Sequence, residues 1–198
     1  NASGLFVGAI GTATQLVRHV LPHDKTYIAR LRLGKETDSG DVLGTVIDEK
    51  PIPSGIKTED IEELLKNKFL GTIRQIPPVY SAIKIDGKRA SDLIRQGKEI
   101  DMAERDVDIY GIKLLQFDGE YLDIEVNCGK GTYIRSLALD IARELNTTAH
   151  LTQLHRCGVG MFSTTPWNPL VSNEEEIIAR QNIYYGRDQI VNDVLDRQ

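Results

Sequence analysis

The sequence predicts an α+β protein in which a mixed, largely antiparallel β-sheet is flanked by helices. Three observations support this fold class. Alternating apolar and polar residues at 26–33 and 121–127 indicate half-buried strands. Apolar residues at helical spacing in 58–68 and 134–145 indicate amphipathic helices. Strands and helices do not alternate regularly, which disfavours a parallel sheet built from strand–helix–strand units.

The first 50 residues contain one clear strand, 26–33, between less regular segments. Residues 5–10 are small and apolar, so we expect them to be buried. Residues 12–20 have the spacing of a short helix. A polar, turn-rich loop is expected at 35–41. Residues 45–47 then form a short strand that could pair back on the strand at 26–33.

A helix and a long hairpin are expected further along. The hydroxyl of Thr58 can cap the helix at 58–68. A strand at 107–117 turns at Asp118-Gly119 into the strand at 121–127, which gives two antiparallel neighbours.

The segment between these elements is rich in turns. Two short strands in residues 71–89 flank the corner Pro77-Pro78, and Asp86-Gly87 has the sequence of a tight hairpin turn. Residues 90–96 form a short helix that Gly97 closes.

The C-terminal part holds one more strand, at 148–159. Helices are expected at 172–180, which starts with a capping box, and at 188–198. We therefore divide the chain into a single domain, residues 1–163, and a partly helical tail, residues 164–198.

An arginine stands in the first turn of the helix at 134–145. Thr132 can cap this helix, because its hydroxyl can accept a backbone N–H. The helix dipole does not explain Arg135, since it favours anions at this end. A guanidinium can hold a carboxylate or a phosphate through two parallel hydrogen bonds. Arg135 is therefore either an ordinary surface arginine or one that holds such a group.

Composition excludes several classes of function. No apolar run approaches the roughly 20 residues that span a bilayer, and the first residues lack the basic start of a secretory signal. Cys128, Cys157 and the four scattered histidines show no metal-ligand spacing. A reduced, cytoplasmic protein is the simplest interpretation. The chain does not begin with Met, so we expect that its start has been cut.

A group of basic residues could form a local surface for nucleic acid, although the net charge of −5 argues against such a partner. Arg74, Lys84, Lys88 and Arg89 lie close in sequence to Tyr80. Basic side chains beside an exposed aromatic suit a surface that contacts phosphates and stacks on bases. The alternative is a solvated hairpin, which composition alone favours.

Five stretches carry motifs that occur together in one order. They are residues 1–5 with 11–14; 24–27 with 33–34 and 37–41; 76–84 with 87–89 and 95–97; 131–137, which reads Gly-Thr-Tyr-Ile-Arg-Ser-Leu; and 154–156. Together they closely resemble the TruB-type tRNA pseudouridine synthases, which make pseudouridine 55 in the TΨC loop of tRNA. The resemblance implies the pseudouridine synthase catalytic fold, an isomerase activity, tRNA as partner, and neither cofactor nor metal.

The resemblance also implies roles for individual residues. Tyr27 matches the tyrosine that stacks on the flipped base, and Arg135 matches the arginine that pairs with the catalytic aspartate. Tyr133 matches the tyrosine beside that arginine. The positions that match the family's substrate contacts are Asp38 in the polar loop, Leu154 in the uracil pocket, and the phosphate contacts Lys84, Lys88, Arg89 and Arg156.

The match departs from the family in three places. The catalytic aspartate belongs to a Gly-His-x-Gly-x-Leu-Asp-Pro run that would end just before Asn1, and no aspartate of this chain fits it. His155 replaces a usual arginine. Residues 164–198 have no counterpart of the RNA-binding PUA domain. We therefore expect the chain to be inactive alone, and expect water or another anion to fill the place of the missing partner of Arg135.

Two other functions stay open. The protein could be a non-catalytic tRNA-binding or chaperone-like protein. It could also be an unrelated small-molecule enzyme that uses Gly129-Lys130-Gly131-Thr132 to hold a phosphate, although this run lacks the spacing of a P-loop. For the favoured function we expect a monomer that needs no protein partner and no membrane.

Overall fold

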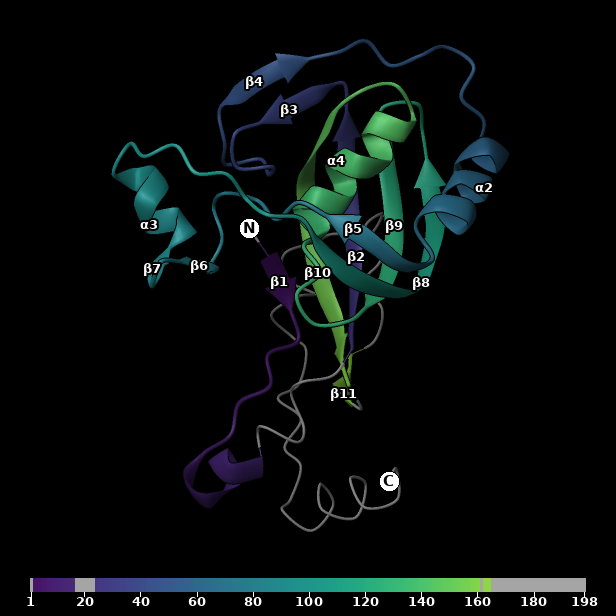
Figure 1. The fold of residues 1–198 in the computed structure, drawn as a ribbon. Helices are drawn as coiled ribbons and strands as arrows, with labels where there is room; N and C mark the ends of the chain where they lie inside the picture. The colour runs from purple at the N-terminus through teal and green to yellow at the C-terminus, as the bar shows by residue number, and fades with distance from the viewer. Residues whose placement is uncertain (1, 17–23, 161, 165–198) are drawn as a thin grey trace.

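One mixed sheet forms the centre of the protein (Figure 1). The computed structural model describes residues 2–16, 24–160 and 162–164. Within them the main sheet has the strand order β1-β10-β2-β9-β8-β5, with β11 paired to β10. Among the described strands of this sheet, β1 and β10 pair in parallel and the other neighbours pair antiparallel. The strands are β1 (Ala2–Gly4), β2 (Lys25–Leu33), β5 (Gly71–Gln75), β8 (Arg105–Phe117), β9 (Tyr121–Cys128), β10 (Ala149–Val159) and β11 (Phe162–Ser163). The predicted fold class is confirmed.

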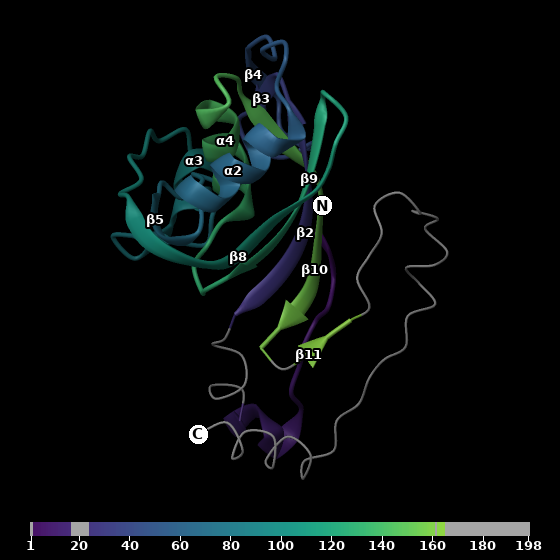
Figure 2. The same cartoon turned by 90° about the vertical axis from the view of Figure 1, so that its right-hand side faces the viewer.

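Helices α2 (Thr58–Lys68) and α4 (Ile134–Glu144) cover the same face of this sheet (Figure 2). Alternation in β2 turns Ala29, Leu31 and Leu33 towards the helices, where all three are buried. The apolar sides of the two helices complete this core with Ile61, Leu65, Leu137, Ala138 and Ile141. The predicted ranges of these strands and helices agree with the structure to within a few residues.

The prediction that residues 5–10 are buried is wrong. The exposed fraction is 84% for Phe6 and 92% for Ile10. Beyond β1 the chain leaves the edge of the sheet, and only the Leu5 N–H, which donates to the Arg156 carbonyl at 2.7 Å, continues the pairing. A 3₁₀ helix, Gly11–Leu16, occupies the start of the helix expected at 12–20. The rest of that helix lies outside the described residues, as do those expected at 172–180 and 188–198.

The first three residues of the loop expected at 35–41 form a strand of a small second sheet, whereas residues 38–41 are a loop as predicted. Strands β3 (Lys35–Thr37) and β4 (Val46–Glu49) pair with each other. The strand expected at 45–47 therefore does not pair on β2, because both edges of β2 are occupied by β9 and β10.

Neither threonine cap forms as predicted. Helix α2 begins after Lys57, whose N–H donates to the Asp60 carboxylate at 3.2 Å. The Thr132 hydroxyl donates to the Gly129 carbonyl at 3.1 Å, so it stabilises the turn before α4. The backbone of Tyr133 is the N-cap of α4.

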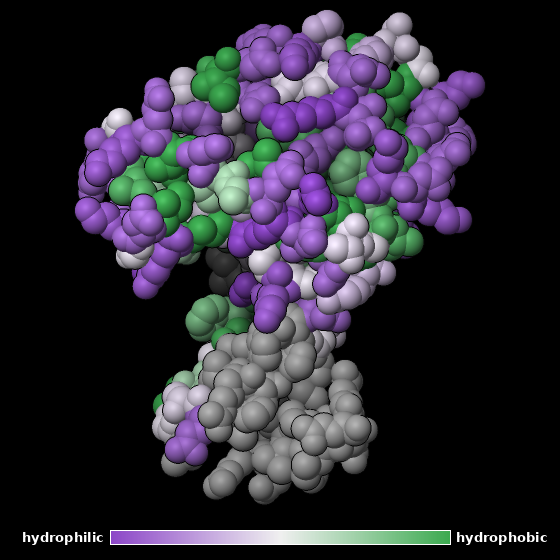
Figure 3. All heavy atoms as spheres, viewed as in Figure 1, coloured by the Kyte–Doolittle hydropathy of each residue, from purple (hydrophilic) through white to green (hydrophobic). Residues whose placement is uncertain are grey.

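Residues 76–104 form an arm that leaves the sheet at the end of β5 and returns at the start of β8. Gln75 and Arg105, at its two ends, are paired residues of the two strands. The arm contains β6 (Lys84–Ile85), β7 (Lys88–Arg89) and α3 (Ala90–Arg95). Asp86 and Gly87 have φ values of 49° and 80°, which confirms the predicted hairpin turn with both residues at positive φ. Figure 3 shows hydrophobic residues over this arm interspersed with hydrophilic ones.

Gln75 joins the base of the arm to the start of α4. Its side chain is 1% exposed. Nε2 donates to the Tyr133 carbonyl at 3.1 Å, and Oε1 accepts from the Tyr133 N–H at 2.8 Å. One side chain thus bonds to two backbone groups at the helix N-terminus and supplies the acceptor that an N–H at this end otherwise lacks.

We expect Gln75→Leu to lower the free energy of unfolding by about 2 kcal/mol, because the Tyr133 N–H loses its partner and the Tyr133 carbonyl keeps only the Leu137 N–H, at 3.0 Å. Urea unfolding measures the change. Gln96→Leu, at an exposed position in the arm, should change it by less than about 0.5 kcal/mol. Equal losses for the two variants would contradict the role given to Gln75.

Candidate functional site

Two side chains in the first turn of α4 bond to segments that are far away in the sequence. Arg135 Nη1 donates to the Ser39 carbonyl at 2.7 Å, and Nη2 donates to the Tyr80 carbonyl at 2.8 Å. The Ser136 hydroxyl donates to the Ile76 carbonyl at 2.7 Å. This turn therefore holds the arm and the loop after β3 together.

Arg135 has partners within the chain, although the aspartate that the family pairs with this arginine is not among them. Its side chain is 22% exposed and is bonded to the two carbonyls, and Asp41 Oδ2 lies 3.9 Å from Nη1. Carbonyl dipoles and one acid thus surround the guanidinium, and the filling of the place of the aspartate by water or another anion stays a prediction. The alternative of an ordinary surface arginine is excluded, because both bonds reach segments far away in sequence.

Asp41 is a site residue that the sequence reasoning missed. Its Oδ1 accepts from the Leu43 N–H at 3.0 Å and from the Ser39 hydroxyl at 2.9 Å, so the carboxylate also orders its own loop. The backbone of this loop reaches the sheet, since the Leu151 N–H donates to the Gly40 carbonyl at 3.0 Å. Gly40 has a φ of 73°, and a Cβ there would lie 3.3 Å from that of Arg135.

Asp38 has a structural role in the same loop. Its Oδ1 accepts from the Thr45 N–H at 2.9 Å, and its own N–H donates to the Thr45 carbonyl at 3.0 Å. These bonds close the connection between β3 and β4. Its predicted contact with substrate stays a prediction.

Tyr27 and Arg156 face each other across β2 and β10, where they are paired residues. Arg156 Nε and Nη2 also donate to the Leu5 carbonyl at 2.9 and 2.8 Å. Burial raises the pKa of the Tyr27 phenol, while the charge of Arg156 and its hydrogen bond oppose this rise. The guanidinium predicted to contact phosphate therefore acts here on Tyr27 and on the segment after β1.

Leu154 lies two residues before Arg156 in β10, opposite Ala29 of β2 and Ala2 of β1. It is partly buried and packs against the main core. This position agrees with a side chain at the edge of a pocket, although the lining of a uracil pocket stays a prediction.

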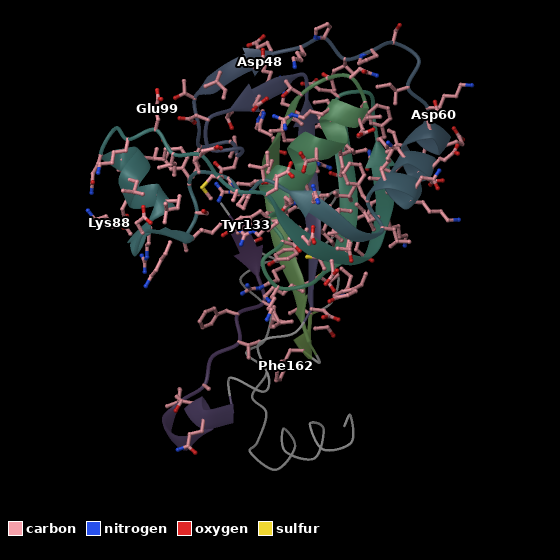
Figure 4. The ribbon with its side chains drawn as sticks, in the orientation of Figure 1. Asp48, Asp60, Lys88, Glu99, Tyr133 and Phe162 are labelled. Carbon is pink, nitrogen blue, oxygen red and sulfur yellow. The ribbon has the colours of Figure 1, made fainter. Side chains whose placement is uncertain are left out.

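The basic residues divide into two groups. Lys84, Lys88 and Arg89 are exposed on the β6–β7 hairpin, and Figure 4 shows Lys88 at the outer end of the arm, far from Tyr133. Arg74 does not belong to this group, because it lies in β5 with carboxylate oxygens of Glu104 and Asp106 at 3.8 and 3.9 Å. The hairpin alone therefore provides the predicted basic surface.

The described residues include no group of three or more His, Cys, Asp or Glu side chains that could hold a metal ion. No helix among them is long and apolar enough to cross a membrane.

Solved structures with the same architecture include proteins that work as parts of larger complexes. A crystal structure of a Cbf5–Nop10–Gar1 complex matches with a TM-score of 0.59 and 27% identity, over 83% of this chain and 39% of the matched chain. An archaeal box H/ACA sRNP Nop10–Cbf5 complex matches with a TM-score of 0.53 over 83% of this chain and 37% of that chain. At 24% identity, this second likeness concerns the fold alone. The architecture is that of the pseudouridine synthase catalytic domain.

Sequence comparison narrows this class to one family. Residues 1–134 match the family model of the TruB family pseudouridylate synthase, N-terminal domain. The tRNA pseudouridine synthase B of Bordetella parapertussis is 47% identical over 163 residues, which cover 82% of this chain and 66% of that protein. That of Francisella tularensis subsp. novicida is 44% identical over 161 residues, covering 81% and 53%. The chain belongs to the TruB family, and it spans between about half and two thirds of the length of these relatives.

We expect Arg156→Gln to raise the pKa of Tyr27 further, because it removes the charge and the hydrogen bond that oppose the effect of burial. Ultraviolet titration of the phenolate, with Tyr27→Phe used to subtract the other tyrosines, measures this pKa. Arg143→Gln, an exposed substitution on α4, should leave it unchanged. A fall in the Tyr27 pKa on loss of Arg156 would contradict the assigned interaction.

Asp140 on α4 makes stability depend on pH. Burial raises its pKa to about 6, Arg143 at 3.8 Å lowers it and Glu104 raises it. The folded state therefore binds a proton more readily than the unfolded state, so the free energy of unfolding falls as pH rises from about 4 to 6.

Asp140→Asn should remove this fall in the free energy of unfolding with rising pH. The variant should be more stable than the parent by about 1 kcal/mol at pH 7, and the gain should shrink at pH 4. Urea unfolding at the two pH values measures it, with Asp92→Asn, in the Asp92–Arg95 pair of the arm, as the control. A gain of the same size at both pH values would show that Asp140 ionisation is not its cause.

Proposed function

We propose that the protein is the catalytic part of a tRNA pseudouridine synthase that isomerises uridine 55 in the TΨC loop. Membership of the family and the names of the relatives support tRNA as the substrate. The nucleophilic aspartate is then supplied by residues that precede Asn1 in a longer protein.

The observation that carries the proposal is the way in which two segments share one edge of β10. Ala2 of β1 is paired with Leu154 in parallel, and three residues earlier in β10, Leu151 is paired with Asp41. A chain that continues β1 backwards therefore reaches the loop that Arg135 holds. The family motif puts the aspartate two positions before Asn1, which in this register is level with Leu151. Because Asp41 already pairs with Leu151, the added segment would end its pairing with β10 where it meets the Asp41 loop.

Arg135 is suited to receive that carboxylate. A guanidinium has five N–H donors, and the two carbonyl bonds use one donor on each Nη. Asp41 at 3.9 Å is beyond hydrogen-bond distance, so it offsets the charge without using the remaining donors. A second carboxylate in this place would be fixed and kept ionised by Arg135, as a nucleophile requires.

The reaction of the family then assigns the other roles. The aspartate attacks the target nucleoside, and the uracil is detached, turned and rejoined through carbon. Tyr27 stacks on the base, and its phenol, whose pKa is raised, stays protonated and able to donate at neutral pH. Stacking of about 1–3 kcal/mol offsets much of the cost of removing the base from the RNA stack.

The basic hairpin completes the proposed substrate surface. Lys84, Lys88 and Arg89 are exposed on the β6–β7 hairpin, and Figure 4 shows Lys88 far from Tyr133, the residue before α4. Phosphate contacts on either side of a flipped nucleotide would be separated in this way. We further propose that the enzyme acts as a monomer in the cytoplasm, with tRNA as its partner and without a protein partner or cofactor.

Tritium release from tRNA carrying 5-tritiated uridine tests the activity. We expect no release by the 198-residue chain and release by a chain extended at its N-terminus with the Gly-His-x-Gly-x-Leu-Asp-Pro segment. The matched control carries Asn instead of Asp in that segment and should be inactive. A transcript that carries tritiated uridine at its other positions, but cytidine at position 55, should release no tritium.

Three results would contradict parts of the proposal. Turnover by the 198 residues alone would refute an external nucleophile, and no turnover by the extended chain would refute the reaction. Filter binding of tRNA distinguishes the remaining function: binding that weakens steeply with salt, without turnover, indicates a tRNA-binding or chaperone-like protein.

Substitution of Lys88 by Ala should reduce the magnitude of the slope of log K against log salt by about 0.7–0.9.

A further inference from the structure

Arg105 and Tyr133 form a contact that the proposed reaction does not use. The Arg105 guanidinium carbon lies over the Tyr133 ring, 5.2 Å from its centroid. This distance is within the range in which the face of an aromatic ring attracts a cation. Arg105 is the first residue of β8, and Tyr133 is the residue before α4.

Arg105 has few other partners. Its Nε and Nη2 are buried, and neither has a hydrogen-bond partner among the residues that the structure describes. Buried donors are nearly always paired, because an unpaired one costs free energy. An arginine in this place therefore costs stability that a neutral apolar residue would avoid, and the face of Tyr133 is what its charge contacts.

Tyr133 is thereby held from two adjacent strands. Gln75 at the end of β5 bonds to both backbone groups of Tyr133, and Arg105 at the start of β8 covers the ring. Gln75 and Arg105 are themselves paired residues. Two residues after Tyr133, Arg135 is bonded to the Tyr80 carbonyl of the arm.

We propose that Arg105 is a positioning residue for Tyr133: its guanidinium fixes the orientation of the ring at the first turn of α4, beside Arg135. Both ends of the arm then bear on this turn, through Gln75 and Arg105. The orientation of Tyr133 depends on where the arm returns to the sheet. The arm, which carries the basic hairpin, is therefore mechanically connected to the first turn of α4. The kinetic consequence of this inference rests on the proposed function, whereas the orientation of the ring does not.

Nuclear magnetic resonance of the 198-residue chain with labelled tyrosine rings tests the orientation. Tyr133→Phe identifies the signal of Tyr133. Arg105→Met should shift this signal more than that of any other tyrosine, and Arg105→Lys, which keeps the charge, should shift it less. Arg143→Met, which removes an exposed arginine from α4 itself, should leave it in place. An unchanged Tyr133 signal in Arg105→Met overturns the proposal.

Kinetics of the chain extended with the nucleophile segment test the consequence. Arg105→Met should lower kcat about tenfold or more while KM for tRNA changes less than about twofold, because misplacement affects the transition state more than binding. Arg105→Lys should recover part of the loss. A raised KM with unchanged kcat would show that Arg105 contacts RNA instead, and would overturn the proposal.

The resonance and kinetic experiments separate this inference from the proposed function. If the extended chain forms no pseudouridine, the proposed function fails and the ring signals alone decide the role of Arg105. A thermal unfolding scan of each variant accompanies both experiments. If Arg105→Met does not fold, Arg105→Lys and Arg105→Gln are compared instead. Arg105→Lys, which keeps the charge, must then leave the Tyr133 signal closer to that of the parent than Arg105→Gln does.

Discussion

One cation determines how the parts around the site fit together. Arg135 donates to the carbonyl of Ser39, in the loop after β3, and to the carbonyl of Tyr80, in the arm. Backbone carbonyls away from water require a donor, and here a single planar fork provides it for two segments at once. Asp41, at 3.9 Å, offsets the charge without closing off the fork. The positions of both segments therefore depend on the first turn of α4.

The sequence was sufficient where local patterns determine structure. Alternation identified β2 and β9, helical spacing identified α2 and α4, and Asp86-Gly87 identified the hairpin turn. It failed where the partner comes from elsewhere in the chain. The cap of α4 is supplied with help from Gln75, 58 residues away, and no local pattern announces this. Residues 5–10 resemble a core segment by composition, yet they lie beyond the edge of the sheet, where little covers them.

The candidate site shows the same division. Family motifs selected Tyr27, Tyr133 and Arg135, and the structure adds that Tyr27 is paired with Arg156 across two strands. Asp38 and Asp41 look alike in the sequence, as acids of one polar loop. Only the geometry distinguishes them: Asp38 accepts from the Thr45 backbone, and Asp41 faces Arg135. These contacts are set by the register of the strands and by how the loop closes, and composition gives information on neither.

The parallel pairing of β1 with β10 has a consequence for the order of assembly. Ser3 and His155, which are bonded to each other, are 152 residues apart. Closing so long a connection costs chain entropy that a neighbouring hairpin such as β8–β9 does not lose. On a ribosome, β1 is made long before β10 and must wait for it before it can dock. The edge to which the proposed nucleophile belongs is therefore completed late, after the rest of the sheet already exists to receive it.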